Sequence, residues 1–365
     1  MRIKIICFLE QRIVLIRQST NHERTKLSMV VLNFYGIISP ICISQKLGLY
    51  VSNIPDATEN SWRDELADRM LLADKTDRNY QRYLGTSFSR GSKELYRKVF
   101  PERNVPKTIK RYHRKALVDR MICLYFDADQ MALPDDNWET NCFIERFCED
   151  DYAEKLVGFI EFLSYDTPDC AFPKPMPQWI YSSNHLEIDH YRIFWGGEPA
   201  AQYLKSLAEW GAMFDRYLEQ ENDYMLFDYL VTSIHKDHEH NEYHFIKAFS
   251  LCQLFLENEK ESELDYKLPL LMEDGDIEQK MLRAASLRKI RNKIAHGDFF
   301  ALDKELEQYA KEFLDGSFWF DYYEYSRRHW ILINVCCYLD DIVRKLIYLE
   351  FNDKAKLKDI RAKTS

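Results

Sequence analysis

Apolar residues recur at steps of three and four along much of the chain, and this periodicity constrains the fold most. One stripe, between Glu198 and Leu218, consists of Ala200, Leu204, Leu207, Gly211, Phe214 and Leu218. A second, between Ser326 and Phe351, consists of Ile331, Val335, Tyr338, Ile342, Leu346 and Leu349. This spacing places apolar side chains on one face of an α-helix. The 365 residues include only 11 glycines, and scarce glycine favours long helices over many short strands.

The fold class that we predict is therefore mainly α. In the C-terminal part we expect helices over residues 198–218, 242–256, 277–296, 302–313 and 326–351, forming a bundle. In the N-terminal part we expect a mixed but mostly helical domain, with helices over 61–84, 107–127 and 141–164. Runs of β-branched residues after Arg2 and Arg12 indicate short strands, and the pattern over 30–43 is ambiguous.

Proline marks the clearest domain boundary. Residues 167–197 contain Pro168, Pro173, Pro175 and Pro177, and such a segment prefers an extended path. We accordingly predict an N-terminal domain over 1–166, a linker over 167–197, a helical bundle over 198–352 and a basic tail over 353–365.

Charge is unevenly distributed along the chain. The net charge is −9, yet residues 198–352 hold 18 Lys and Arg against 30 Asp and Glu, a net of −12. Nucleic-acid binding therefore cannot rest on overall charge and needs a local basic patch. The nine cysteines include no C-x-x-C pair, which argues against a zinc framework and for reduced thiols. No apolar run is long enough for a membrane span, so we expect a cytoplasmic protein without membrane contact.

The predicted helix over 277–296 departs from this acidic background. Between Gln279 and Gly297 it carries six basic residues and no acidic one: Lys280, Arg283, Arg288, Lys289, Arg291 and Lys293. Like charges three and four residues apart repel on a helix surface. A polyanionic partner would account for an arrangement that stability alone does not favour.

The end of this helix carries the candidate chemistry. Gly297 is suited to the position just beyond a helix C-terminus, so His296 lies in the last turn. Asn292 precedes His296 by one turn on the same face, where it can orient the imidazole or a phosphate. Arg291 is displaced from His296 by about 140° around the helix. Two copies of this helix end would therefore surround a phosphate better than one.

The run Arg291-Asn292-Lys293-Ile294-Ala295-His296 resembles the R-x(4–6)-H signature of HEPN-domain ribonucleases, in which a polar residue follows the arginine. The layout, a separate N-terminal region before a helical bundle, is similar to the ApeA-like HEPN proteins of bacterial antiviral defence and toxin systems. The resemblance covers residues 198–352.

The resemblance implies a cofactor-free, metal-independent endoribonuclease. The 2′-hydroxyl of RNA would attack the adjacent phosphorus, with His296 as general acid and base, Arg291 stabilising the phosphorane oxygens and Asn292 positioning them. Arg288, Lys289 and Lys293 would bind the RNA backbone. Family members build the site by pairing two domains, and one copy in this chain implies a homodimer. An inhibitor or activator is not identifiable from the sequence.

Two other readings of the sequence compete with catalysis at this site. The same bundle can act without catalysis, as a module for dimerisation and for RNA or protein binding. The histidines His235, His238, His240 and His244 can instead form a metal site, although a polar loop capped by Asn241 is the simpler interpretation and we predict no metal.

A second basic patch lies in the N-terminal part. Residues 90–115 have ten basic and two acidic residues, and they include Arg111, Arg114 and Lys115 as candidate RNA contacts. A solvated helix face explains this patch equally well.

Overall fold

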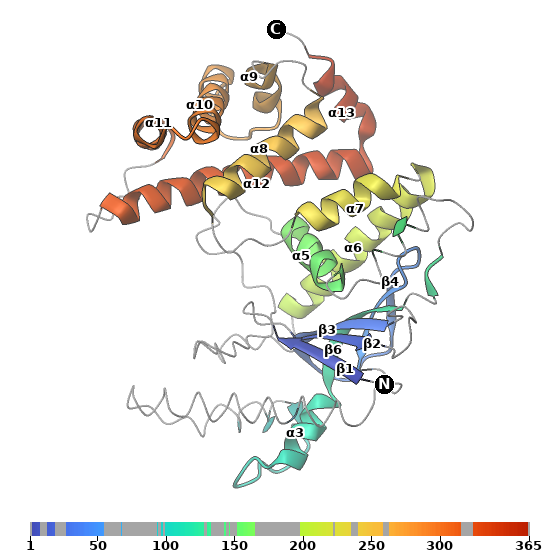
Figure 1. Cartoon of the computed structure of the whole chain (residues 1–365). Coiled ribbons are helices and arrows are strands. Elements are labelled where there is room, and N and C mark those ends of the chain that lie inside the picture. Colours follow the sequence, from blue (N-terminus) through green and yellow to red (C-terminus); the bar gives the residue numbers. More distant parts are fainter. Residues whose placement is uncertain are drawn as a thin grey trace. The chain divides into compact units, whose positions relative to one another are not determined.

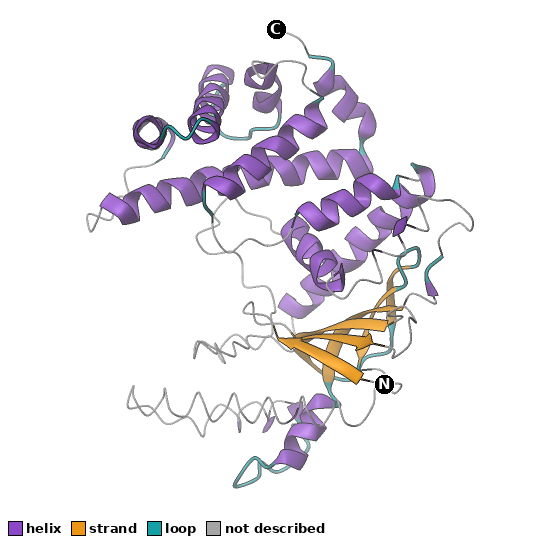
Figure 2. Ribbon diagram, in the orientation of Figure 1, coloured by secondary structure: helices purple, strands orange, loops and turns teal. Residues whose placement is uncertain are grey.

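The computed structural model describes residues 2–7, 13–18, 27–54, 67, 93, 96, 97, 99–127, 130–132, 142, 143, 146, 152–164, 198–221, 223–234, 240–257, 263–314 and 324–363. The described chain is mainly helical, as expected (Figures 1 and 2). It divides into two compact units, one made of residues 1–164 and 175–235 and the other of 165–174 and 236–365. The expected linker over 167–197 lies outside the described residues.

The first unit contains an antiparallel sheet in the order β1-β2-β3-β6-β5-β4. Its strands are β1 (Arg2–Cys7), β2 (Ile13–Gln18), β3 (Leu27–Tyr35), β4 (Ile41–Ser44), β5 (Leu49–Asn53) and β6 (Met121–Asp127). The strands expected after Arg2 and Arg12 are thus confirmed as β1 and β2. The ambiguous segment 30–43 falls on β3 and β4.

The helices of the first unit are α3 (Arg111–Val118), α5 (Tyr152–Ser164), α6 (Glu198–Gln220) and α7 (Tyr224–Ser233). Figure 1 shows α5, α6 and α7 gathered on one side of the sheet. The expected helix over 107–127 is wrong in its second half, because Met121–Asp127 forms β6 between β3 and β5. Of the expected helix over 61–84, only Ala67 is described, and it is helical.

Aromatic packing holds these helices together. The ring of Phe214 on α6 lies 5.8 Å from that of Phe159 on α5 and 5.2 Å from that of Phe227 on α7. All three side chains are fully buried. Burying a large aromatic side chain stabilises a fold by about 2–3 kcal/mol, so this cluster is a main source of cohesion in the unit.

Helix α6 also packs directly on β4. A Cβ at Gly211 would lie 2.1 Å from the carbonyl oxygen of Ile43, so glycine is required for this approach. One turn later, Asp215 accepts hydrogen bonds from the hydroxyl of Ser44 (2.6 Å) and from the amides of Gln45 (2.9 Å) and Lys46 (3.0 Å). Helices α6 and α7 therefore belong with the sheet, and the boundary at 197/198 expected from the sequence differs from the one observed at 235/236.

The second unit is helical throughout its described part. Its elements are α8 (Glu242–Leu256), α9 (Leu264–Lys267), the 3₁₀ turn η4 (Leu268–Leu270), α10 (Ile277–Ala295), α11 (Phe299–Phe313), α12 (Glu324–Asn352) and α13 (Lys354–Arg361). Helices α8 and α12 lie side by side (Figure 1). The expected helix over 242–256 has the observed bounds, and α10, α11 and α12 are within three residues of expectation.

The C-terminal segment is part of this unit and differs from the expected basic tail. Leu357 and Ile360 of α13 are buried. Arg361 donates to the carbonyl oxygen of Phe255 at 2.7 Å and pairs with Glu350 and Glu257. The positive charges of this segment are therefore partly used to fix α13 to α8 and α12.

Candidate functional site

Hydrogen bonds at both ends fix the boundaries of helix α10. At its start, the side chain of Asp276 accepts a hydrogen bond from the amide of Gln279 at 2.9 Å. At its end, Gly297 adopts a φ of 67°, and its amide donates to the carbonyl of Ile294. The amide of Asp298 donates to the carbonyl of Lys293, which completes a Schellman motif. The glycine stop expected from the sequence is confirmed, and His296 is the C-cap residue.

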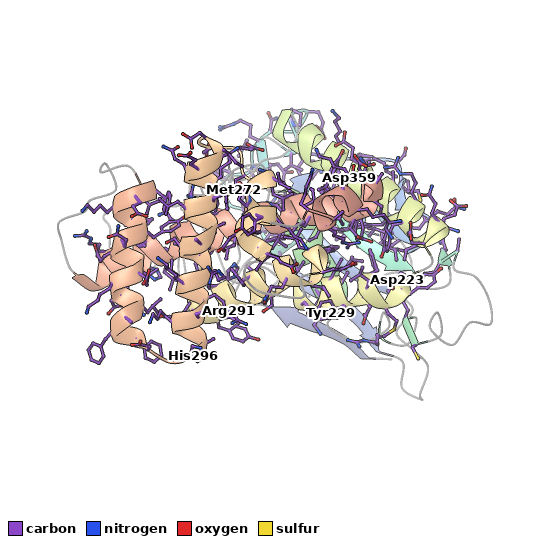
Figure 3. All side chains as sticks on the ribbon, turned by 90° about the horizontal axis from the view of Figure 1, so that it is seen from above. Asp223, Tyr229, Met272, Arg291, His296 and Asp359 are labelled. Atoms are coloured by element: carbon purple, nitrogen blue, oxygen red, sulfur yellow. The ribbon has the colours of Figure 1, made fainter. Side chains whose placement is uncertain are left out.

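The same turn starts the next helix. Asp298 is the N-cap of α11, and its carboxylate accepts from the amide of Ala301 at 3.2 Å. Three residues, His296, Gly297 and Asp298, therefore join α10 to α11, and the two helices pack against each other. Figure 3 shows Arg291 and His296 at the same end of α10. The imidazole of His296 thus lies in the turn between the two helices. We call this turn, residues 296–298, the α10–α11 corner, and hydrogen bonds hold its backbone at both ends.

The three predicted catalytic residues have exposed or half-buried side chains. His296 is exposed, and it makes no side-chain hydrogen bond or ion pair within the described part of the chain. Arg291 and Asn292 are half-buried, and a guanidinium nitrogen of Arg291 donates to the amide oxygen of Asn292 at 3.1 Å. Asn292 therefore orients Arg291 in this structure, where the sequence suggested contact with the imidazole or a phosphate.

The basic side chains of α10 do not form one continuous surface, because some of them are engaged by other helices. Arg288 makes a bidentate ion pair with Asp265 of α9, with contacts of 2.7 and 3.0 Å. Arg283 lies 3.4 Å from the ring centre of Tyr338 and donates to the hydroxyl of Tyr309 at 2.8 Å. Burial raises the pKa of Tyr338 to about 12 although Arg283 opposes it, so this phenol stays neutral. The prediction that Arg288 binds RNA conflicts with its engagement by Asp265.

The two lysines near the helix end are more accessible. Lys289 is exposed and makes no ion pair with any residue that the structure describes. Lys293 lies 3.5 Å from the carboxylate of Asp298, and both side chains are at least one-third exposed. An exposed pair of this kind contributes little to stability, so Lys293 remains accessible to an anion.

Aromatic residues next to the corner are a feature that the sequence analysis missed. Phe299 and Phe300, the first two residues of α11, are 57 % and 89 % exposed. Two adjacent exposed rings beside cations suit the stacking of nucleic-acid bases. The only sequence signal was their position directly after the motif.

In the second basic patch, the structure contradicts one of the three predicted RNA contacts. Arg114 is 2 % exposed, which leaves its guanidinium no surface for a phosphate. Arg111 is exposed and Lys115 is half-buried. All three lie on α3 in the first unit, whereas α10 belongs to the second. The prediction for Arg114 is therefore wrong, because its position in α3 faces the interior.

Two histidines of the cluster that was weighed as an alternative metal site lie close to a residue that the sequence did not suggest. Nε2 of His244 lies 2.9 Å from both carboxylate oxygens of Asp340 on α12. The ligand atoms of His240, His244 and Asp340 all lie within 4.8 Å of one another. His235 and His238 lie outside the described residues. Asn241 caps α8 by accepting from the amide of His244 at 3.0 Å, as expected.

Comparisons with known proteins add no relative, since no family model, no curated protein and no solved structure matches this chain. Among the described helices, none combines the length and apolar character that crossing a membrane requires. Function is therefore inferred from the geometry of the α10–α11 corner.

Proposed function

We propose that the protein is a metal-independent endoribonuclease of the HEPN type, with Arg291, Asn292 and His296 at its active site. The observation that carries the proposal is the placement of an exposed imidazole, without a side-chain partner among the described residues, at a fixed helix corner. A guanidinium lies one to two turns earlier at the same end of the helix (Figure 3). Bacterial antiviral defence or a toxin system is the setting we propose.

The chemistry follows from the side chains available. His296 would take the proton from the RNA 2′-hydroxyl as its oxygen attacks phosphorus, and would return a proton to the leaving 5′-oxygen. The products would be a 2′,3′-cyclic phosphate and a 5′-hydroxyl. Arg291, held by Asn292, would stabilise the extra negative charge on the phosphorane oxygens.

Substrate binding would come from the residues around this corner. Lys289 and Lys293 supply accessible positive charge for the RNA backbone. Phe299 and Phe300 would stack on unpaired bases, which favours single-stranded RNA or loops over regular duplex. With the imidazole and the guanidinium of one chain on diverging helix faces, we propose a homodimer that brings two corners together.

The decisive test is cleavage of labelled RNA in EDTA by the full chain and its variants. We expect the parent protein to cut and to leave 2′,3′-cyclic phosphate ends. Arg291→Ala and His296→Ala should each lower the rate by at least about 100-fold, because each removes a group that acts in the transition state.

Matched controls are available in α12 of the same unit. His329 is exposed and Arg327 is 43 % exposed, so His329→Ala and Arg327→Ala remove the same chemical groups away from the corner. Both should cut at nearly the parent rate. Retention of RNA without cutting in any variant would favour the non-catalytic binding module, and cutting that survives His296→Ala would refute the proposal.

A further inference from the structure

A buried carboxylate in the second unit has little local compensation. Asp340 of α12 is 7 % exposed, and within the described chain its hydrogen-bond donor is His244, which is also 7 % exposed. Burying a charged carboxylate costs several kcal/mol unless a cation accompanies it. The positive charge of a metal ion bound by both side chains would offset this cost.

The buried thiol of Cys252 is also affected by the charge of Asp340. Burial, and then the negative charge of Asp340, raises the pKa of the Cys252 thiol far above its usual value. The group whose ligand atoms lie within 4.8 Å of one another consists of His240, His244 and Asp340 and does not include Cys252. The groups able to hold a cation here are two imidazoles and one carboxylate.

The distances suit a metal ion. With zinc–nitrogen and zinc–oxygen bonds of about 2.1 Å, two ligand atoms of one zinc ion lie roughly 3.0–3.4 Å apart. Nε2 of His244 and the oxygens of Asp340 are already 2.9 Å apart. His240 completes a group within 4.8 Å, and its half-exposed side chain precedes the helix cap, so it can approach without disturbing α8.

We infer that His240, His244 and Asp340 form a zinc site that fastens the start of α8 to the middle of α12. Three protein ligands leave a fourth position, which water can fill. The site uses no residue of α10 or α11. It is therefore independent of the proposed ribonuclease chemistry, which needs no metal.

The test is a binding measurement on the full chain after chelation and removal of the chelator. Titration with Zn²⁺ should show one equivalent bound per chain, and Co²⁺ should give a visible absorption band. His240→Gln and Asp340→Asn should each weaken Zn²⁺ binding by at least about ten-fold and remove the band. His329→Gln, an exposed histidine on the same helix as Asp340, should bind like the parent.

The variants are chosen so that misfolding does not decide the result. Asp340 is buried, and its loss can unsettle the unit, whereas His240 is half-exposed and its replacement should leave the circular dichroism spectrum unchanged. Absence of stoichiometric Zn²⁺ binding would overturn the inference. So would undiminished binding by His240→Gln, or binding lost only when His235 and His238 are replaced together. RNA cleavage is not a readout here, so the two proposals fail separately.

Discussion

Arg288 and Arg291 lie three residues apart on one helix but have different roles in the structure. Arg288 is held by Asp265 through a bidentate pair whose side chains are 27 % and 17 % exposed. Arg291 contacts the neighbouring Asn292 at 3.1 Å. We therefore assign Arg288 to stability and propose Arg291 for chemistry.

This division predicts that two similar substitutions differ in their effect on the free energy of unfolding. Arg288→Ala should lower the free energy of unfolding by about 1–2 kcal/mol, because it strands a half-buried carboxylate. Urea denaturation of Arg288→Ala, Asp265→Ala and the double variant measures the coupling. Additive losses would mean that the pair contributes nothing. Arg291→Ala should change stability little.

Contacts between distant residues, such as these ion pairs, could not be predicted from the sequence, and the reason is physical. Asp265 precedes Arg288 by 23 residues, and Asp340 follows His244 by 96. Helical periodicity relates only residues three and four apart, so the acid-free stretch around Arg288 looked uncompensated. The motif itself was local, and the cap at Gly297 could be predicted from it.

At the scale of elements, the corner between α10 and α11 is a turn of three residues, His296 to Asp298. Gly297 has a φ of 67°, and a Cβ there would meet nothing within 4 Å. Only backbone conformation therefore resists a side chain at this position. Asparagine tolerates the left-handed region better than alanine does.

We expect Gly297→Ala to destabilise the protein by about 1 kcal/mol and Gly297→Asn by less. Thermal unfolding of the two variants tests this, since neither adds a steric contact. Equal losses would show that the corner is held by something other than its backbone conformation.

Element type was predictable where apolar periodicity was long, and less so elsewhere. Helix α8 has the predicted bounds, whereas the run Met121–Asp127 was assigned to a helix and forms β6. A continuous short apolar run fits a buried strand and a buried helix equally well. Helix α6 was predicted as a helix but assigned to the wrong unit, because periodicity reveals an apolar face without revealing what covers it.

At the scale of the whole molecule, the proposed dimer predicts that two inactive variants can complement each other, which a site within a single chain would not allow. If each phosphate is gripped by Arg291 of one copy and His296 of the other, a mixed dimer of Arg291→Ala and His296→Ala contains one intact site. Mixing the two inactive proteins should restore about a quarter of the parent activity, since about half the dimers are mixed and each has one of two sites.

The comparison requires exchange of subunits, which brief incubation at low concentration before the assay promotes. The singly substituted proteins alone, at the same total concentration, are the baseline. No recovery in a sample shown to contain mixed dimers would place both groups of each site on one chain.

The contact between α8 and α12 has a consequence for the order in which the chain acquires its structure. Helices α10 and α11 are joined by three residues and can form as a hairpin while the chain is still being made, since local contacts close fastest. Asp340 reaches the ribosome exit only after all of α8 to α11 has passed. We expect the candidate catalytic corner to be in place before its unit is fastened, so the His240–His244–Asp340 group closes a structure that is already largely assembled.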